Sequence, residues 1–477
     1  MRPPFPFFLA ACAALACATN PATGAKELML ISESQEIAMG QGYDKDVVAS
    51  IGLYADTGMQ RWIQQFGSQL ATTSERPNLP WTFHVVDDPV VNAFAIPGGY
   101  IYVTRGILAH LNSEAELAGV VGHEIGHVTA RHSVSQMSKQ QLAQVGLAIG
   151  SIASSDFERY AGLASAGLGV LFLKFSRDAE SQADHLGLRY MRRAHYDARE
   201  MPHVFDMLTR VSQAQGGGRV PEWLATHPNP ENRRGKIEQE IASEPQDFAG
   251  SMVNRDAYLR RLEGLVYGDD PREGYFKGAL FLHPGLRFRL TFPDGWATSN
   301  GKQSVVAVSP QKDGAVELGF AAEPSADAAA RTFLSQKGVT GSYPVRASVG
   351  GLPAVSAGFA AATDNGTLRG SAVFIEYGGA VYRLIGYSTE ASWPAYQSIA
   401  ERSLLSFARL TDPAVLGVQP QRVTIVRTDR RTTIAELARQ RPSPLPPTSL
   451  ALINQVEPDT PVDAGRLVKW VVGAPPP

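Results

Sequence analysis

The spacing of hydrophobic residues over the first 270 positions is mainly that of amphipathic helices. Ser32 and Gln35 have the spacing of a capping box, which predicts the start of an amphipathic helix of about three turns. A second helix is expected over roughly residues 57–73. Helical periodicity returns in three later segments, at about 114–132, about 157–194, and a last segment ending near 265.

Two segments inside this helical region have a strand-like pattern instead. Residues 81–87 and 95–104 are rich in β-branched and aromatic side chains, and Pro97-Gly98-Gly99 marks a turn. The apolar run 161–173 is too short to cross a bilayer and is expected to be a buried or lid helix. The pattern therefore predicts a mainly helical domain with a small sheet over residues 31–267.

The pattern changes after Gly268-Asp269-Asp270-Pro271. Leu286, Phe288, Leu290 and Phe292 alternate with polar residues, which predicts a strand with one apolar face. Further strands are expected at 305–308, at 316–320 and on either side of Gly378-Gly379, with helices at 325–337 and 393–405. Residues 276–410 are thus predicted to form an α+β sandwich, followed by a third, small unit over 411–477. The whole chain is placed in the α+β class.

The N-terminal segment has the composition of an export signal. Residues 1–16 form a short apolar signal peptide, and Ala14-Leu15-Ala16-Cys17 has the pattern of a bacterial lipobox, in which Cys17 is lipidated. Leu9-Ala10-Ala11-Cys12 fits the same pattern but would leave a very short hydrophobic region, so Cys17 is preferred. Residues 17–30 are then a lipidated leader. Ala18 after the cysteine favours a periplasmic protein tethered to the outer membrane through an N-terminal lipid anchor.

The net charge and the positions of the cysteines limit the kinds of binding partner and covalent cross-link that the sequence supports. The net charge is −2 and no long basic run occurs, so the sequence gives no support for a nucleic-acid partner. Both cysteines lie in the N-terminal segment, and the remaining chain has neither a thiol nor a disulfide.

The strongest chemical signal is His123-Glu124-Ile125-Gly126-His127, on a helix that Ser113 and Glu116 are expected to cap. Residues four apart share one helix face, so both imidazoles can bind a single zinc ion. Zinc lowers the pKa of a bound water, and Glu124 beside it is the natural general base for activating that water. His132, five positions after His127, lies on another face and is expected to be structural.

A third ligand has to come from another segment. Glu180 is the best candidate, because it shares a helix face with Asp184 and is flanked by small residues that would allow a close approach to the motif helix. His123, His127 and Glu180 would then hold one Zn²⁺ per chain. Asp184 would hold a ligand imidazole or a nearby arginine.

A further constellation runs from Thr226 to Arg233 and has two interpretations. It is either a capped helix start after a Pro-rich turn, or a segment that brings His227 to the zinc and Arg233 into the catalytic site. In the second case His227 either donates a hydrogen bond to the developing oxyanion or takes the fourth zinc position as a gate. We favour the gate. Separately, Asn92, Ala93, Phe94 and Ala95 could form an exposed edge that pairs with an extended substrate.

Taken together and in this order, these motifs resemble the HtpX and CAAX prenyl protease 1 family of zinc metalloendopeptidases, in particular its periplasmic BepA-like lipoprotein branch. The resemblance covers about residues 17–265 and rests on the lipobox, the segment from Ile31 to Glu36, Asn92 to Ala95, the His-Glu-x-x-His helix, the Glu180/Asp184 pair and His227-Pro228. It implies a gluzincin with Glu180 as third ligand, and it favours the gate over the oxyanion donor as the role of His227. It also implies hydrolysis of misfolded or unassembled envelope polypeptides with little sequence preference.

The resemblance stops at about residue 265. The membrane-spanning helices and the helical-repeat domain found elsewhere in the family are absent here. Residues 423–472 resemble a degenerate LysM-type module, which would make peptidoglycan a partner. The alternatives to a protease are a chaperone-like protein with a latent or structural zinc site and a peptidoglycan-associated binding protein.

Overall fold

The computed structural model describes residues 17–146, 174–214, 223, 226–227, 230–243, 248–363 and 366–475. The predicted signal peptide, the apolar run 161–173 and most of the glycine-rich loop near 216–218 lie outside the described residues. The described chain falls into two compact units. The first combines residues up to 269 with residues 421–473, and the second comprises 270–420.

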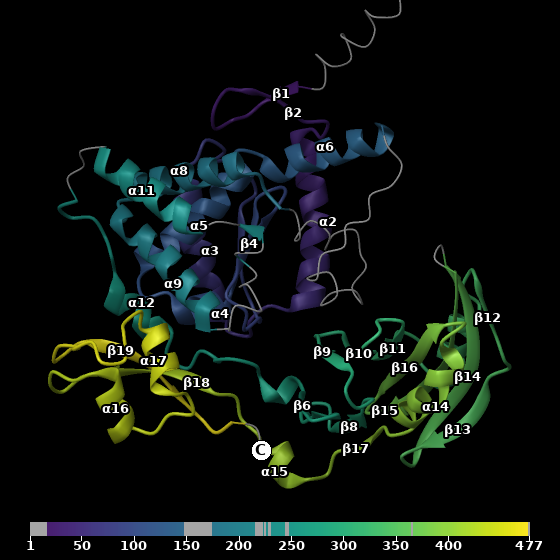
Figure 1. Cartoon of the computed structure of the whole chain (residues 1–477). Helices are drawn as coiled ribbons and strands as arrows, with labels where there is room; N and C mark the ends of the chain where they lie inside the picture. The colour runs from purple at the N-terminus through teal and green to yellow at the C-terminus, as the bar shows by residue number, and fades with distance from the viewer. Residues whose placement is uncertain are drawn as a thin grey trace, which may run out of the picture. The chain divides into compact units, whose positions relative to one another are not determined.

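The N-terminal part of the first unit has a small sheet flanked by helices (Figure 1). After the hairpin β1 (Cys17–Thr19) and β2 (Lys26–Leu28) come α2 (Glu33–Ile51) and α3 (Thr57–Ala71). The sheet has the order β3-β5-β4, with β3 (Thr82–Val86) parallel and β4 (Ala93–Ile96) antiparallel to β5 (Tyr100–Thr104). Helix α3 packs on β3 and α2 on β4.

The remaining helices of this part surround α5. In chain order they are α4 (Arg105–His110), α5 (Glu114–Thr129), α6 (His132–Gly146), α8 (Arg177–Arg193), α9 (Met201–Ala214), α11 (Pro230–Ser243) and α12 (Arg255–Arg261). Every residue of α5 after Glu114 is buried, and α5 packs against α8, α9, α3 and β4. The helix that carries the motif is therefore the centre of the first unit.

Helix α2 is longer than the sequence pattern predicts. The Ser32–Gln35 capping box is confirmed, but the helix has 19 residues instead of about three turns. It contains Gly40, a residue that weakens a helix in isolation. A Cβ atom at Gly40 would overlap the carbonyl oxygen of Pro97, so glycine lets α2 lie directly on the turn between β4 and β5. Tertiary packing outweighs local propensity here.

Residues 421–473 pack into the first unit, which corrects the prediction of a separate third unit. Strands β18 (Arg422–Arg427) and β19 (Leu467–Val472) are antiparallel, with α16 (Ile434–Gln440) and α17 (Pro447–Ile453) between them. Val423 and Leu467 belong to the same hydrophobic core as α5. Lys469 is fully buried and donates hydrogen bonds to the carbonyl oxygens of Ala109 (2.7 Å) and Leu111 (2.6 Å).

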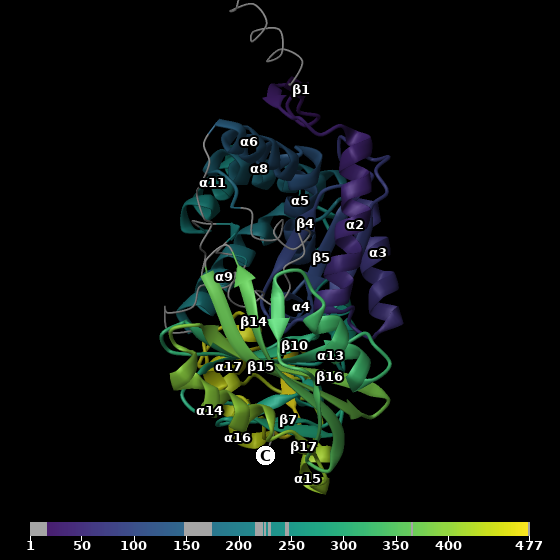
Figure 2. The same ribbon diagram turned by 90° about the vertical axis from the view of Figure 1, so that its right-hand side faces the viewer.

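The second unit is built on an antiparallel sheet with the order β12-β14-β15-β16-β11-β10-β9, in which β13 also pairs with β14. Helices α13 (Ala326–Leu334) and α14 (Trp393–Leu404) lie on opposite faces, because α13 packs on Phe374 and α14 on Val373 and Ile375 of the same strand (Figure 2). A second sheet has the order β17-β8-β7-β6. The strand bounds are β6 Tyr275–Lys277, β7 Leu280–His283, β8 Phe288–Thr291, β9 Ala297–Asn300, β10 Ser304–Val308, β11 Gly314–Ala321, β12 Val339–Gly341, β13 Val345–Val349, β14 Leu352–Thr363, β15 Gly366–Tyr377, β16 Ala380–Thr389 and β17 Ala408–Arg409.

The predicted apolar face at 286–292 is only partly correct. Phe288, Leu290 and Phe292 are buried, but Leu286 is 39 % exposed and lies before β8. Arg287 has a φ of 58°, a left-handed conformation that ends the extended pattern between these residues. The alternation of apolar and polar residues therefore begins at Leu286, before the first residue of strand β8. Mixed helix and sheet, as the α+β prediction requires, are present in both units.

Within the described residues, no helix combines the length and the apolar character that a membrane span needs.

Candidate metal centre

The motif helix α5 is fixed at its start by the residues that the sequence predicts. The Ser113 side chain accepts a hydrogen bond from the backbone N–H of Glu116 at 3.0 Å. The reciprocal half of a capping box is not made, because the Glu116 carboxylate accepts from the backbone N–H of Asn112 instead. Glu116 also accepts from the Gln455 side chain at 2.9 Å, which ties the first turn of α5 to residues 421–473.

Helices α5 and α8 approach each other very closely, and glycine makes this approach possible. A Cβ atom at Gly126 would lie 3.0 Å from the carbonyl oxygen of Ala183. A Cβ atom at Gly187 would lie equally close to the backbone nitrogen of His123. The contact places Glu180, in the first turn of α8, opposite the two histidines of α5.

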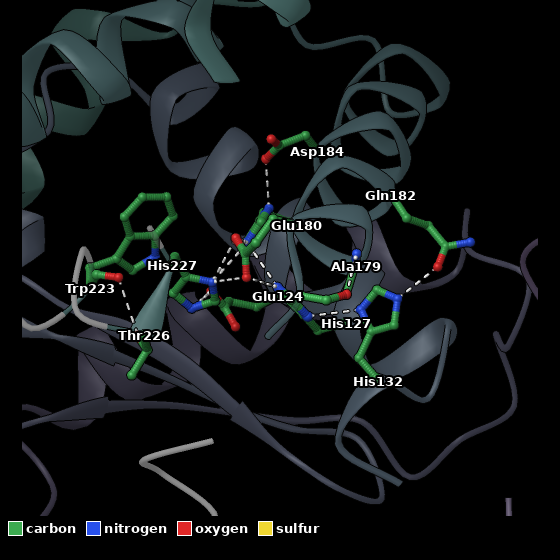
Figure 3. Close-up of polar contacts among 12 residues, drawn as sticks. Glu124, His127, His132, Ala179, Glu180, Gln182, Asp184, Trp223, Thr226 and His227 are labelled. Carbon is green, nitrogen blue, oxygen red and sulfur yellow. Dashed lines mark hydrogen bonds and ion pairs between the residues drawn. The ribbon is translucent and has the colours of Figure 1, made fainter. Parts of the chain in front are cut away.

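Four buried side chains from three segments converge at this contact (Figure 3). The Nε2 atoms of His123 and His127 are 3.0 Å apart, and they lie 3.6 and 3.5 Å from the Glu180 carboxylate. His227 Nδ1 is 2.9 Å from Glu180 Oε1 and 3.3 Å from His123 Nε2. The structure thus brings together the three predicted ligands and adds His227 to the same group.

The donor set and its spacing fit zinc. Three imidazole nitrogens and one carboxylate oxygen are ligands that zinc prefers, and metal–ligand bonds of about 2.0–2.1 Å in a tetrahedron would separate neighbouring donors by about 3.3 Å. The five distances above, from 2.9 to 3.6 Å, lie on both sides of that value. Side chains on three separate segments are therefore placed at the separations that one tetrahedral ion requires.

Asp184 and Arg233 form a second layer around these donors. Asp184 Oδ1 is 2.9 Å from His123 Nδ1, the ring nitrogen that faces away from the other donors. Arg233 donates to Asp184 through Nε at 2.8 Å and lies 2.9 Å from Glu180 Oε2. Arg233 therefore contacts two site carboxylates, which favours a positioning role over the catalytic role that the sequence suggests.

The His127 ring is oriented on its other side by His132 and Phe175, whose contact with His127 the sequence does not predict. His132 Nδ1 lies 2.9 Å from His127 Nδ1, and His132 Nε2 lies 2.7 Å from the side-chain oxygen of Gln182. Phe175 stacks on the His127 ring with a centroid distance of 4.2 Å. His132 is thus adjacent to the donor group without being part of it, and it restrains the His127 ring.

Glu124 points at the donor group from the same helix. Its Oε1 atom is buried, has no hydrogen-bond partner among the described residues, and lies 3.7 Å from His227 Nε2. Burial raises the pKa of Glu124 to about 7, although the nearby His227 works in the opposite direction. A buried carboxyl group with a pKa near neutrality and a free oxygen is suited to take up and return a proton.

The pKa values around Glu180 depend on two opposing effects. Burial lowers the pKa of His227, but the carboxylates of Glu180 and Glu124 outweigh burial and raise it above the ordinary value. Burial would raise the pKa of Glu180, but His227 and its neighbours lower it overall. Glu180 is therefore held as a carboxylate, the form that binds a cation.

Trp223 is part of the site although no local pattern in the sequence indicates it. Its indole ring stacks on His227 with a centroid distance of 4.8 Å and an interplanar angle of 27°. Its backbone carbonyl accepts a hydrogen bond from the His227 N–H at 2.8 Å, and the Arg233 guanidinium lies 4.9 Å from the indole ring. The His227 segment is thus held in place by stacking and by hydrogen bonding.

A buried charge network fastens the other end of α5. Arg76 donates to both carboxylate oxygens of Glu36 at 3.0 Å and to the carbonyl oxygen of Val128 at 2.9 Å. Arg131 also donates to Glu36, at 2.8 Å, and to the carbonyl oxygen of Ile31. The last turn of the motif helix is therefore anchored to α2 by ion pairs that are buried from solvent.

In the segment predicted to bind substrate, Ala93, Phe94 and Ala95 belong to strand β4, which lies at an edge of the sheet, and Asn92 precedes the strand. In the order β3-β5-β4, one side of β4 has no strand partner among the described residues. The side chains of Asn92 and Ala93 are buried, whereas Phe94 and Ala95 are half-buried. Strand β4 packs against α5, the helix that carries Glu124.

The fold and the site define the class. A buried helix with His-Glu-x-x-His, a glutamate from a second helix in contact with both histidines, and a further carboxyl group with one oxygen not hydrogen-bonded are the features of a zinc metallopeptidase domain.

Comparison with known proteins agrees and gives the family. Residues 58–241 match peptidase family M48, and this stretch contains all the site residues described above from Arg76 to Arg233. Over these residues the chain is therefore similar to peptidase family M48.

The similar proteins are named as proteases. Over 224 residues the chain is 32 % identical to the beta-barrel assembly-enhancing protease of Escherichia coli (strain K12), covering 45 % of each chain. Over 221 residues it is 34 % identical to the mitochondrial metalloendopeptidase OMA1 of Arabidopsis thaliana, covering 42 % of this chain and 43 % of that one. The chain thus spans less than half the length of these two relatives.

Among solved structures, cyanobacterial PsbP from Synechocystis sp. PCC 6803 matches 28 % of the chain at 14 % identity with a TM-score of 0.24, which carries no argument.

Proposed function

We propose that this protein is a zinc-dependent metalloendopeptidase that hydrolyses peptide bonds of misfolded or unassembled envelope proteins. The observation that carries the proposal is the buried group of His123, His127, Glu180 and His227, with Glu124 beside it and one oxygen of Glu124 not hydrogen-bonded. The names of the similar proteins support proteolysis. The envelope substrates follow from the similarity to the beta-barrel assembly-enhancing proteases together with the predicted export signal.

The residues of the site divide the work of hydrolysis. His123, His127 and Glu180 would hold the zinc, which supplies Lewis-acid chemistry and lowers the pKa of water. Glu124 accepts the proton of the attacking water and returns it to the leaving amine, because its carboxyl group is buried with one oxygen free. Asp184 fixes the His123 ring through Nδ1, and Arg233 holds both Asp184 and Glu180 in place. An extended substrate would pair with the edge of β4.

The general-base role of Glu124 is tested by cleavage of an unfolded model protein. Glu124→Gln keeps the shape of the side chain and removes its capacity to accept a proton. We expect the variant to bind zinc and to lose cleavage by a factor of about 100 or more. Cleavage by Glu124→Gln at the wild-type rate and equal zinc content would contradict the mechanism.

The ligand assignment is tested separately by metal analysis. Glu180→Ala should lose bound zinc and activity together, because it removes the carboxylate that contacts both His123 and His127. A Glu180→Ala protein with full zinc and full activity would show that Glu180 is not a ligand.

We further propose that His227 is a gate. With His227 among the donors, protein side chains fill all four tetrahedral positions, and a water molecule has no place. Hydrolysis then requires His227 to move away, and His227→Ala should raise the rate of proteolysis at equal zinc content. A fall of about a hundredfold would instead identify His227 as an oxyanion donor, and an unchanged rate would remove it from the site.

The membrane attachment is a separate proposal. Two or more lipid chains anchor a protein stably, at about 0.8 kcal/mol per buried CH₂ group. Cys17→Ser should therefore release the protein from the membrane fraction into the soluble periplasmic fraction. A wild-type protein that already fractionates as soluble would contradict lipidation at Cys17.

A further inference from the structure

The second unit has an open groove of about 620 Å³ between α14 and the outer end of the sheet. Its floor consists of small residues on the face of β14 and β15 that α14 partly covers, among them Ser356, Gly358, Ala360 and Ser371. Its walls come from α14 and its C-cap and from the stretch between β12 and the start of β13. They include Trp393, Gln397, Leu405, Thr340, Ser342 and Val345.

Exposed apolar side chains gather at the rim of this groove. In the described part of the second unit, the exposed large hydrophobic residues are Leu286, Phe320, Tyr343, Val345 and Leu405. Three of these lie here: Tyr343, between two residues of the wall, is 90 % exposed, Val345 is 61 % exposed and Leu405 is 55 % exposed. Apolar residues that cluster around a hollow are typical of an interaction site, whereas single exposed ones are not.

The charged groups of the groove already have partners. The Glu401 carboxylate accepts hydrogen bonds from Ser371 Oγ at 3.2 Å and from Gln397 Nε2 at 3.0 Å. The Arg369 guanidinium donates to the Glu390 carboxylate at 2.9 Å. One carboxylate and one guanidinium balance each other, so the groove offers neither a basic surface for phosphate groups nor an acidic one for cations.

The floor also leaves room for a backbone to lie against it. A Cβ atom at Gly358 would meet only Ser342 Oγ at 3.6 Å and the Gly370 carbonyl oxygen at 4.0 Å, both ordinary contacts. The hydroxyl group of Ser356 lines the same hollow and can bond to peptide N–H and C=O groups, whereas the hydroxyls of Thr340 and Ser342 already hydrogen-bond to the backbone of Ala360 and Gly358. Small residues, hydroxyls and apolar rims without net charge match an extended polypeptide with apolar side chains.

We propose that this groove binds an extended, apolar stretch of unfolded polypeptide, and that the second unit thereby captures the substrate of the metallopeptidase domain. This proposal deepens the proposed function and rests on it for the identity of the substrate. The two units are joined through residues 269–270 and 420–421, so a captured chain stays tethered to the protease. Tethering of this kind raises the local substrate concentration to about the millimolar range, which favours the cleavage of long unfolded chains.

Binding is measured in the full-length chain carrying Glu124→Gln, so that the probe is not cut. The probe is fluorescein-labelled, reduced and carboxymethylated lactalbumin, and the readout is fluorescence anisotropy. Gly358→Trp fills the groove at a position with open space, and Leu405→Glu places a charge on its exposed rim. We expect each variant to raise the dissociation constant at least tenfold. Thr298→Trp, on the exposed strand β9 of the same sheet, is the matched control and should bind like the parent.

The two variants test the groove independently of each other. Leu405 is more than half exposed, so Leu405→Glu tests the groove even if Gly358→Trp folds poorly. If both variants fold and bind the probe with the parent affinity, the proposal is wrong. Binding of phosphatidylethanolamine–phosphatidylglycerol vesicles with no binding of the polypeptide would assign the groove to lipid and also overturn it.

The same design separates this proposal from the proposed function. A wild-type protein that cleaves nothing, with binding that still depends on Gly358, refutes the peptidase and supports the groove. Cleavage by the wild type together with groove variants that bind normally supports the peptidase and refutes the groove.

Discussion

Replacement of Lys469 by methionine tests how residues 421–473 support the motif helix. Lys469 is fully buried on β19 and donates to the carbonyl oxygens of Ala109 and Leu111, at the end of α4 and just before α5. The last carbonyl groups of a helix have no partner within the helix, and this lysine supplies one. Methionine has a similar length, fills the same space and donates no hydrogen bond.

The expected loss follows from the two carbonyl groups. Each buried carbonyl left without a partner costs about 1–3 kcal/mol, so two cost about 2–6 kcal/mol. The substitution also recovers part of this free energy, because the Lys469 amine is costly to bury away from water. This cost is seen in the pKa of Lys469, which burial lowers well below its ordinary value. We expect a net loss of about 3 kcal/mol in the free energy of unfolding of the first unit.

Two measurements check this value. With a denaturant slope of about 3 kcal/mol per molar, the urea midpoint of the first unit should fall by about 1 M. Backbone amides of α4 and the first turn of α5 should exchange with solvent about 100-fold faster, since each 1.4 kcal/mol corresponds to a factor of ten. The matched control is Lys236→Met, on the exposed face of α11.

The reasoning would be refuted by a Lys469→Met protein whose midpoint and exchange rates equal those of Lys236→Met. A loss of protection spread evenly over the first unit, with no excess at α4, would also contradict it. In that case the lysine would contribute to global stability without any particular hold on the start of α5.

Three further predictions concern the site and its surroundings. Asp184→Asn should weaken zinc binding about 10- to 100-fold, measured by competition with a chelator, and an unchanged affinity would exclude its role in orienting His123. Burial raises the pKa of Glu116 to about 7. The protonated carboxyl group therefore stabilises the folded state, and this contribution is lost as the pH rises through that value. Between about pH 5 and 7 the unfolding free energy of the wild type, measured by urea titration, should fall relative to that of Glu116→Gln. Parallel curves for the two proteins would contradict this. Removal of zinc should lower the stability of the first unit by about 2.7 kcal/mol relative to protein in zinc at 100 times its dissociation constant, reversibly, and His123→Ala should show no such response.

The parts of the site that could be predicted share one property, namely that their members are neighbours on one helix. The four-residue spacing of His123 and His127, and that of Glu180 and Asp184, places each pair on a single face whatever the rest of the chain does. Trp223 could not be found this way. Its contacts with His227 and Arg233 depend on how separate segments meet, and no spacing within the sequence encodes them.

The ion pairs behind α5 are a second example. Glu36, Arg76 and Arg131 are buried together although they are 40 to 95 residues apart in the sequence. Taken singly, each looks like an ordinary surface charge, because charged residues are seldom buried without a partner. Helix α2 is longer than its sequence predicts for a related reason, since Gly40 is favoured by contact with the β4–β5 turn and disfavoured by helix propensity.

The insertion of the second unit between residues 269 and 421 has a consequence for the timing of synthesis. All donors of the metal centre precede residue 230, but the lysine that caps α4 is on β19. At roughly 5–20 residues per second, the roughly 240 residues between His227 and Lys469 take roughly 12–48 s to make. During that interval the nascent protein contains every ligand yet lacks the support at the start of α5. A protease assembled in this order reaches its full stability only after the groove-bearing unit has been made.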